Sequence, residues 1–487
     1  MQRRDFNQLL ALCAVAGPSM AGAAGAAICA RGFYEKTEAE SAAGAAVVDT
    51  SRCPGDWRRY GADPTGNRDS TAAIQAACAA NSVAFDVEGG TYLVSGRIVI
   101  PSGVTVRGAG AKATRIVCSH GGISVFIASG ATGSGIEKLK ISVQETSKEA
   151  HTGAVEFNRS TNCTCRECEF EGCNWAGVLL HDSAYCTVDH CDFHDFHGAV
   201  QDSADIFIYN RSHHNSITNN RCFGGNWHGI AIQDPYSNSL PSNNTVAGNI
   251  VGEHRAYGIL VYVPSTGDTF NHVTGNTVEN IQGSVLENNS GAGIYVVGAG
   301  AGGTAVAGNT VRNCCVQTTR RSLAPAGIGV AGISPAAAPI SVTGNTISDM
   351  HGYDSILIVS CKGTVTVSGN TATMPGNSTG MPIQVHASSN VRVTGNTAAR
   401  DAGSGGRCIF VYANAIAVSN VAVIGNTCVG GGHPQIEFLA TDGGSMAGAV
   451  CMDNICRANA PNTDCVRISG VANAAISGNT CLTLPSV

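Results

Sequence analysis

The sequence is poor in charged residues: Asp, Glu, Lys and Arg make up 13% of its 487 residues, about half the usual share. So little charge excludes a coiled coil and a charge-driven disordered chain. The formal net charge of −6 argues against a nucleic-acid partner, because proteins that wrap nucleic acids are normally basic. No apolar run reaches the roughly 18–20 residues of a membrane-spanning helix, so we expect no membrane span. What the chain has in abundance is glycine, at 61 residues.

The first 26 residues have the features of an export signal. An RRDF motif at residue 3 precedes the apolar run Leu9–Val15, and small residues follow Pro18. This order is typical of a signal peptide, and the arginine pair favours the twin-arginine type over an ordinary secretory signal. We expect 1–26 to be removed and the protein to be periplasmic or secreted. Residues 27–52, rich in Ala, Gly and Glu, are predicted to be a flexible leader.

The body of the chain is repetitive. From about residue 165, one phrase recurs every 28 residues or so: an apolar residue, two spacers, Asn, one spacer and an apolar residue, as in VTGNTV at 273. We expect the Asn slot to form a ladder at one turn, with Asn in the left-handed conformation it tolerates. The residues in this slot are Cys168, Cys191, Asn220, Asn249, Asn276, Asn309, Asn345, Asn370, Asn396, Asn426, Asn454 and Asn479.

A second phrase lies between these copies and reads small, apolar, variable, apolar, as in GIAI at 229 and GILV at 258. Such alternation predicts a short, half-buried strand. Two short strands per repeat, separated by Gly and Asn turns, exclude helical solenoids and fit a propeller poorly. The predicted fold is all-β: a single-stranded right-handed parallel β-helix from about residue 85 to 483, one coil per repeat.

The N-terminal third carries a family resemblance. WRRYGADPTGNRDSTAAIQAACAA from Trp57 and GGTYLVSGRIVIPSGVTVRGAGAKATRI from Gly89 resemble the entry module of the pectate-lyase-like right-handed β-helix superfamily, which includes rhamnogalacturonases, epimerases and phage tail spikes. The resemblance covers 57–117. It implies an entry module over 53–120, repeat coils over 121–487, and a polymer lying along one outer face.

A short Ala-rich helix in this module should plug the end of the bore, because a solenoid needs capped ends. Either Asp69 or Ser70 is placed to cap it.

Twenty-one cysteines need explaining. Cys428, Cys456 and Cys481 share one slot of the repeat, where neighbouring coils bring Cα atoms within disulfide range. For these three we favour free core thiols, whereas for Cys168 and Cys191 a thiol and a disulfide remain equally open. The spacing in CTCRECEFEGC at 163 suggests metal ligands but lies inside the strand-turn repeat. We therefore expect no metal site; Ca²⁺ is indicated by no motif, and no cofactor is expected.

Polar and aromatic side chains gather between residues 174 and 262, in NWAGVLLHDS at 174, DFHGAVQDS at 195, NWHGIAIQDP at 226 and HRAYGILVYV at 254. Aligning these segments on the small residue that opens each strand predicts two columns. One contains Ala176, His197, His228 and Tyr257, and the other contains His181, Asp202, Gln233 and Tyr262. Later coils have fewer polar and aromatic residues at the same positions.

The alignment argues against a standard polygalacturonase. Residues 227–232 resemble that family's GHGISI segment, but its acidic slots hold Ala176 and His197 here. Glycoside hydrolysis needs two carboxyl groups across the scissile bond. Asp202 and Asp234, at the other end of the strands, are the available replacements.

The remaining side chains suit proton abstraction beside a carboxylate. His228 or His197 is the candidate base, Arg255 the group that neutralises the carboxylate, and Tyr257 or Tyr262 the acid. His181, Trp227, Tyr257 and Tyr262 are the candidate substrate-binding residues, and Asp202 and Asp234 form an opposite margin.

The leading hypothesis is an exported lyase or uronate C5-epimerase acting on an acidic polysaccharide. Two alternatives stay open: a glycoside hydrolase with a non-standard acid pair, and a non-catalytic carbohydrate-binding or structural solenoid of the envelope. The polysaccharide is the expected partner, and the sequence leaves the oligomeric state open.

Overall fold

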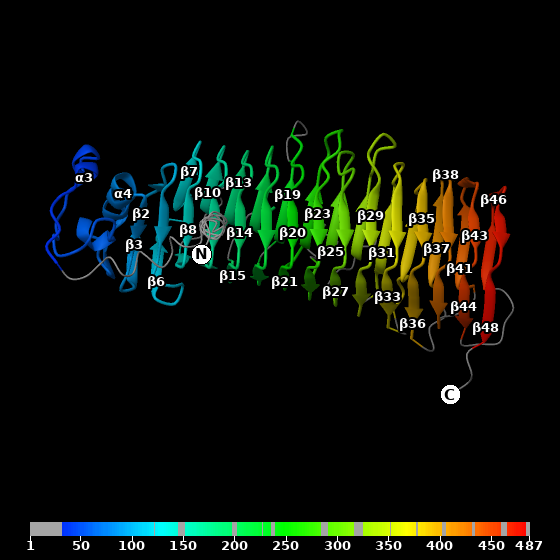
Figure 1. Ribbon diagram of the computed structural model, residues 1–487. Coiled ribbons are helices and arrows are strands. Elements are labelled where there is room, and N and C mark those ends of the chain that lie inside the picture. The colour runs from blue at the N-terminus through cyan, green and yellow to red at the C-terminus, as the bar shows by residue number, and fades with distance from the viewer. Residues whose placement is uncertain are drawn as a thin grey trace, which may run out of the picture.

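Short parallel strands stack side by side along the whole length of the molecule, with the helices at its N-terminal end (Figure 1). This computed structural model describes residues 32–120, 122–144, 151–196, 202–225, 227–234, 239–283, 291–315, 325–350, 352–375, 378–401, 406–430, 434–458 and 465–483. Within these ranges no helix has the length and apolar character needed to cross a membrane. The predicted signal peptide, residues 1–26, lies outside them.

Three long sheets form the walls of the solenoid, and every pairing within them is parallel between successive coils. The 16-stranded sheet contains β1 (Thr65–Asp69), β3 (Gly90–Val94), β6 (Thr114–Cys118), β9 (Lys140–Val143), β12 (Glu169–Glu171), β15 (Asp192–His194), β18 (Arg221–Phe223), β21 (Ile250–Gly252), β24 (Thr277–Glu279), β27 (Thr310–Arg312), β30 (Thr346–Ser348), β33 (Thr371–Met374), β36 (Thr397–Arg400), β40 (Thr427–Val429), β44 (Ile455–Ala458) and β48 (Thr480–Thr483). The 14-stranded sheet contains β4 (Ile98–Val99), β7 (Phe126–Ser129), β10 (Gly153–Asn158), β13 (Ala176–His181), β16 (Ala204–Tyr209), β19 (His228–Gln233), β22 (Tyr257–Tyr262), β25 (Ala292–Val297), β28 (Ala326–Ala331), β31 (Asp354–Val359), β34 (Ile383–His386), β37 (Ile409–Asn414), β41 (Ile436–Thr441) and β45 (Val466–Ser469).

The 15-stranded sheet contains β2 (Val83–Phe85), β5 (Thr105–Arg107), β8 (Gly135–Glu137), β11 (Thr164–Arg166), β14 (Thr187–Asp189), β17 (Ser216–Thr218), β20 (Thr245–Ala247), β23 (His272–Thr274), β26 (Ala305–Ala307), β29 (Ile340–Thr343), β32 (Val365–Ser368), β35 (Val391–Thr394), β39 (Val421–Ile424), β43 (Val450–Met452) and β47 (Ala475–Ser477). A small sheet is added near the C-terminal end by β38 (Ala417–Ser419), β42 (Ser445–Ala447) and β46 (Val471–Ala472). The strands span residues 65–483, which confirms the predicted parallel β-helix from about 85 to 483.

Each coil has three strands rather than the two expected, because the Asn phrase spans a bend between two strands. In VTGNTV, β23 ends at Thr274 and β24 begins at Thr277. The left-handed residue at this bend is Gly275, with φ of 62°, and not Asn276. The glycine absorbs the strained conformation, so that the asparagine side chain can turn into the bore.

The asparagine ladder itself is confirmed. Asn276 donates from Nδ2 to Oδ1 of Asn309 at 3.0 Å, and its backbone N–H donates to the same oxygen at 2.9 Å. Its Nδ2 also reaches the carbonyl of Val246 on the preceding coil at 2.9 Å. The pattern repeats from Asn220 to Asn479. A second, shorter ladder that the repeat analysis missed joins Asn215, Asn244 and Asn271.

Apolar side chains fill the bore in columns. In the 14-stranded sheet one column holds isoleucine on successive coils, for example Ile230, Ile259 and Ile294, all fully buried. Each such side chain contributes about 1.5–3 kcal/mol by leaving water. Phe170 and Phe193 stack across neighbouring coils with centroids 4.7 Å apart. The bore is thus a dry core that fixes the outward positions of the same strands.

The predicted capping helix is present as α4 (Thr71–Ala80), whose Ile74, Ala77 and Cys78 are buried. Of the two candidate caps, Asp69 does the capping: its Oδ1 accepts from the backbone N and the hydroxyl of Thr71. Ser70 makes no side-chain cap bond.

Residues 32–52 differ from the flexible leader that we expected over 27–52. They contain α3 (Glu38–Ala42), which begins with a capping box, and they dock on the 3₁₀ turn η2 (Trp57–Tyr60). The reason is a buried ion pair: the Arg59 guanidinium donates to both Glu40 oxygens, at 2.6 and 3.0 Å. Burial would raise the pKa of Glu40, but donors from Arg59, Thr37 and Tyr60 lower it to about 2.

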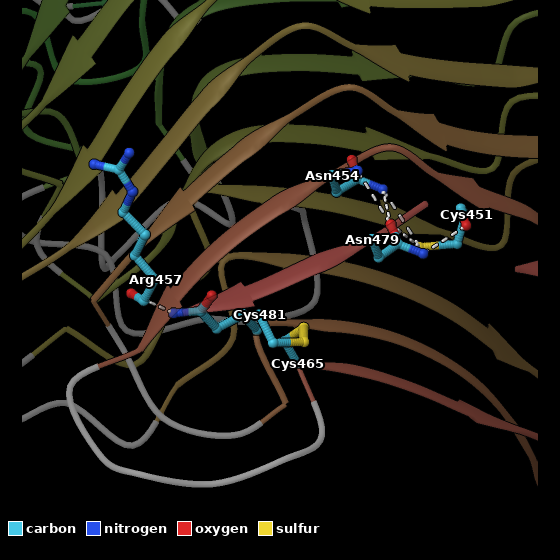
Figure 2. Close-up of a disulfide and its surroundings, with 7 residues drawn as sticks. Cys451, Asn454, Arg457, Cys465, Asn479 and Cys481 are labelled. Carbon is cyan, nitrogen blue, oxygen red and sulfur yellow. Dashed lines mark hydrogen bonds between the residues drawn. A yellow bond between two sulfur atoms is a disulfide. The ribbon is translucent and has the colours of Figure 1, made fainter. Parts of the chain in front are cut away.

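Sixteen cysteines of the described chain are buried free thiols, among them Cys168, Cys191, Cys428 and Cys456. The expectation of free core thiols therefore holds for Cys428 and Cys456 but is wrong for Cys481. Cys481 forms a disulfide with Cys465, which closes the last coil near the end of the asparagine ladder (Figure 2).

Candidate functional site

The outer face of the 14-stranded sheet carries a second hydrophobic layer, separate from the bore. In β13, Val178 and Leu180 belong to the bore, whereas Ala176 and Leu179 belong to the outer layer. This outer layer lies over β13, β16, β19 and β22, the coils that the sequence singled out, and reaches β25, which the sequence did not indicate. Its members are Trp175, Ala176, Leu179, Ala204, Phe207, Tyr209, Ala231 and Leu260, with Tyr257, Tyr262, Tyr295 and Val297 at its edge.

The strand register corrects the predicted columns. Ala204 of β16 pairs with both Ala176 and His228, so the strand starts at residue 204 and not near 198. His197 is therefore not the partner of His228 in this column, and its own position lies outside the described residues. Tyr209 replaces Asp202 in the second column, beside His181 and Gln233.

The misalignment has a physical cause. Asp205 occupies the position that glycine takes on the neighbouring coils, at Gly177 and Gly229. It is fully buried, and its Oδ2 lies 3.0 Å from Nε2 of the equally buried His254. Burial raises the pKa of Asp205. This pair was missed because a small residue was taken as the marker of a strand start.

His228, the candidate base, begins β19 and is buried, at 1% exposure, so it does not reach substrate directly. Its ring stacks on Tyr257 with centroids 5.3 Å apart, and Tyr257 stacks on Tyr295 at 5.1 Å. Its Nε2 lies 3.9 Å from Oδ1 of Asp202. Burial lowers the pKa of His228 despite this carboxylate, so its imidazole is neutral at pH 7.

Asp202 is exposed, at 63% of its side chain, and the adjacent His228 lowers its pKa. Arg255 is exposed at the entrance to β22. Asp202 and Arg255 are thus the charged groups of the predicted site that solvent reaches.

The remaining predicted residues separate into two groups. His181, Tyr257 and Tyr262 are partly exposed at the edge of the outer layer, and His181 packs edge-on against Tyr209 at 5.5 Å. Trp227 is buried. Asp234 is fully buried and accepts from the hydroxyls of Ser239 and Ser265, so it forms no open margin opposite the histidines.

A pocket that the sequence did not indicate opens further along the same face, over β31, β34 and β37. It has a volume of about 610 Å³, and Asp354, Gln384, His386, Phe410 and Tyr412 are among the residues lining it. The only signal in the sequence was the polar residue that opens DSILIV at 354. The other lining residues come from different coils, each unremarkable alone.

One group of side chains in the described part of the chain has its ligand atoms close enough together for a metal ion: Glu171, His194 and Asp195, within 4.8 Å of one another. His194 already contacts Glu169 and Asp195 through its two ring nitrogens. Glu171 belongs to the CTCRECEFEGC segment, but within the described ranges the cysteines of that segment are not part of this group.

A family model described as right handed beta helix region matches residues 102–316. None of the curated proteins compared with the chain matches it significantly.

Two solved structures share the fold. The catalytic unit of a GH87 α-1,3-glucanase from Streptomyces thermodiastaticus is 16% identical, over 87% of this chain and 68% of that one, with a TM-score of 0.52. A tailspike protein mutant of E. coli bacteriophage HK620, in complex with a pentasaccharide, is 13% identical over 87% and 78%, with a TM-score of 0.55. At these identities the likeness is one of fold. The chain thus has the parallel β-helix fold, and part of it matches this family model.

Proposed function

We propose that the chain is an exported, carbohydrate-active β-helix protein that binds a polysaccharide across the outer face of the 14-stranded sheet. The observation that carries the proposal is the column of stacked rings formed by His228, Tyr257 and Tyr295, one per coil. The Tyr257 and Tyr295 rings are partly exposed and His228 lies buried behind them. Such rings offer the apolar surface, and the tyrosine hydroxyls the hydrogen bonds, that sugar recognition uses. A solenoid repeats such groups along an extended surface, which suits a long polymer.

The solved structures that share the fold support a carbohydrate ligand, since one is titled an α-1,3-glucanase and another was determined with a pentasaccharide. The RRDF motif supports export, because it stands before an apolar run as in twin-arginine signals.

For the chemistry, we favour a lyase or C5-epimerase acting on an acidic polysaccharide. Three groups support it: the exposed Asp202 carboxylate, the neutral His228 behind it and the exposed Arg255, two residues before Tyr257 in the chain. Asp202 is the candidate proton acceptor that reaches substrate, His228 positions it, and Arg255 neutralises a uronate carboxylate. The hydrolase alternative loses support because Asp234, one of its two carboxyl groups, is buried between two serines.

The test compares the full-length mature protein with Tyr257→Ala on a panel of acidic and neutral polysaccharides. Tyr185→Ala is the matched control, because Tyr185 is exposed and lies on a different part of the coil. We expect Tyr257→Ala to weaken binding about tenfold or more and Tyr185→Ala to leave it unchanged. Equal binding by both variants, or no binding by the unmodified protein, would overturn the proposal.

The same panel separates the chemistries. Ultraviolet absorbance of an unsaturated uronate identifies a lyase, and a changed uronate configuration by NMR without that absorbance identifies an epimerase. New reducing ends alone would identify a hydrolase. Binding without any product would identify a non-catalytic protein and contradict the assignment of Asp202.

A further inference from the structure

The pocket over β31, β34 and β37 lies where one outward-facing position of the sheet changes from a small side chain to large rings. Val359, His386 and Tyr412 occupy the same position on three successive coils. Tyr412 covers one side of the His386 ring, with centroids 5.3 Å apart. The coil on the other side has only the short Val359 at this position, and the recess opens beside it.

The ring end of the pocket is held in place. Phe410 stacks on Tyr412 with centroids 5.3 Å apart, and the Tyr412 hydroxyl lies 3.0 Å from that of Thr441. The Arg407 guanidinium lies over Phe410 at 4.4 Å. These contacts fix a flat, partly exposed aromatic wall, formed by His386 and Tyr412, without help from a ligand.

The other end of the pocket is a nearly buried carboxyl group. Asp354 is 9% exposed, and its Oδ1 accepts from the backbone N–H of Met381 at 2.7 Å. With its side-chain amide turned so that the nitrogen faces the carboxyl group, Gln384 donates to Oδ2 at 2.7 Å and to Oδ1 at 3.2 Å. A carboxylate offers about four acceptor positions, so capacity remains on the side that lines the pocket.

The groups around Asp354 are mostly uncharged. Arg400 of β36 is the nearby cation, and it donates to the carbonyls of Ser378 and Gly380. The thiol of Cys315 is a second titratable group that interacts with Asp354. Tyr353 and His386 line the pocket. Burial lowers the pKa of His386, which leaves its ring neutral at pH 7. The pocket therefore presents one carboxyl group, an amide, hydroxyls and flat rings.

We propose that this pocket is a saccharide-binding site for an uncharged, hydroxyl-rich sugar unit, with the Asp354 carboxylate accepting from sugar hydroxyls and His386 and Tyr412 packing against the ring. The inference rests on the proposed function, because the pocket lies on the same outer face. It adds to that function a second binding site for the polysaccharide and names the ligand of that site. An anionic unit is disfavoured because the lining, as far as the described residues form it, supplies a carboxylate and no lysine or arginine. One charge-assisted acceptor beside an aromatic wall is a common way to orient a neutral sugar-sized ligand.

Burial raises the pKa of Asp354 to about 7. Binding that uses the carboxylate should therefore strengthen from pH 6 to pH 8, as the proton leaves. This pH dependence should vanish in Asp354→Asn, which keeps the shape of the side chain.

The experiment titrates the full-length mature protein with neutral gluco-, galacto- and manno-tetrasaccharides at pH 6 and pH 8. Binding is followed by calorimetry and by the His386 ring signals in NMR, assigned with a His386→Gln variant. For the best tetrasaccharide we expect Asp354→Asn to weaken binding at pH 8 by about tenfold or more and to remove the pH dependence. Asp349→Asn is the matched control, because Asp349 is exposed at the end of β30, and should bind as the unmodified protein does.

The proposal is overturned if no tetrasaccharide shifts the His386 signals, or if Asp354→Asn binds as tightly as the unmodified protein at pH 8. Should Asp354→Asn fail to fold, Gln384→Ala removes the second polar group and must weaken binding instead. Tyr257→Ala separates this site from the proposed function. If polysaccharide binding depends on Tyr257 while the NMR signals of His386 do not shift, only the saccharide site in the pocket is rejected. If the NMR signals of His386 shift while Tyr257→Ala leaves polysaccharide binding unchanged, only the proposed role of the ring column is rejected.

Discussion

Asn276 and Asn309 lie one coil apart, and the Oδ1 of Asn309 accepts both the side-chain and the backbone N–H of Asn276. The Nδ2 of Asn309 donates in turn to Val273 and Asn345. Because all of these groups are buried, Asn309→Ala leaves several of them unsatisfied at once. We expect a loss of at least about 3 kcal/mol, measured by denaturant unfolding. Asn67→Ala, at an exposed asparagine, should change stability by less than about 0.5 kcal/mol. Similar losses for both would contradict the ladder as a stabilising element.

Glu40→Ala tests the docking of the N-terminal segment. The change leaves the buried Arg59 without its carboxylate, and we expect a loss of about 3–5 kcal/mol. Glu38→Ala, at an exposed glutamate of the same helix, should be nearly neutral. The pKa of Glu40 is lowered to about 2, so the stabilisation is present above its ordinary pKa near 4.5 and disappears as the pH falls toward 2. Melting temperatures of both variants between pH 2 and pH 7 check this. Parallel melting-temperature curves for Glu40→Ala and Glu38→Ala would contradict the contribution of the Glu40 carboxylate.

His228→Ala should lower stability, since the side chain is buried against Tyr257. A cavity of this kind costs about 2–4 kcal/mol, measured by denaturant unfolding. His228→Gln fills part of the space and should cost less. If His228 positions Asp202, both variants should also move the acidic limb of the pH–activity profile to higher pH. The reason is that the imidazole no longer lowers the pKa of Asp202. An unchanged profile would leave His228 a purely structural residue.

Asp354→Asn should change how stability depends on pH. The folded protein holds this proton up to about pH 7, whereas an unfolded aspartate releases it near pH 4. The folded state therefore binds more protons between these values, and stability falls as the pH rises from 4 to 7. Replacing the carboxyl group by an amide should remove this pH-dependent decrease, which amounts to about a few kcal/mol in the free energy of unfolding. Calorimetric scans at pH 5 and pH 8 measure it, with Asp349→Asn as the control. An equal decrease in both variants would contradict burial of the carboxylate.

Replacing Arg3 and Arg4 by lysine tests the export route. We expect the precursor to stay in the cytoplasm if the signal is of the twin-arginine type, measured by fractionation and by the N-terminus of the exported form. Replacing Arg31 and Arg52, outside the signal, should leave export unchanged. Normal export of the first variant would point to the general secretory route.

The sequence was most informative where one residue type recurs at one slot. The asparagine phrase predicted the ladder and the length of the repeat because its side chain makes the same hydrogen bonds on successive coils from Asn220 onward. The site was less predictable because its chemistry depends on register. Asp205, in place of a glycine, hid the start of β16, and this error put His197 and Asp202 into the wrong columns. The Asp354 pocket could not be predicted because β31, β34 and β37 each contribute only two or three of its side chains, and none of these segments stands out alone.

The ladder also sets how the molecule can change in evolution. Since each coil offers the next one the same asparagine, isoleucine column and strand edges, a whole coil can be duplicated or lost without breaking the stack. The chain between Asn249 and Asn276 is one such unit. Descendants would then lengthen or shorten the outer face of the 14-stranded sheet in steps of about 4.8 Å, while the side chains of each remaining coil stay in place.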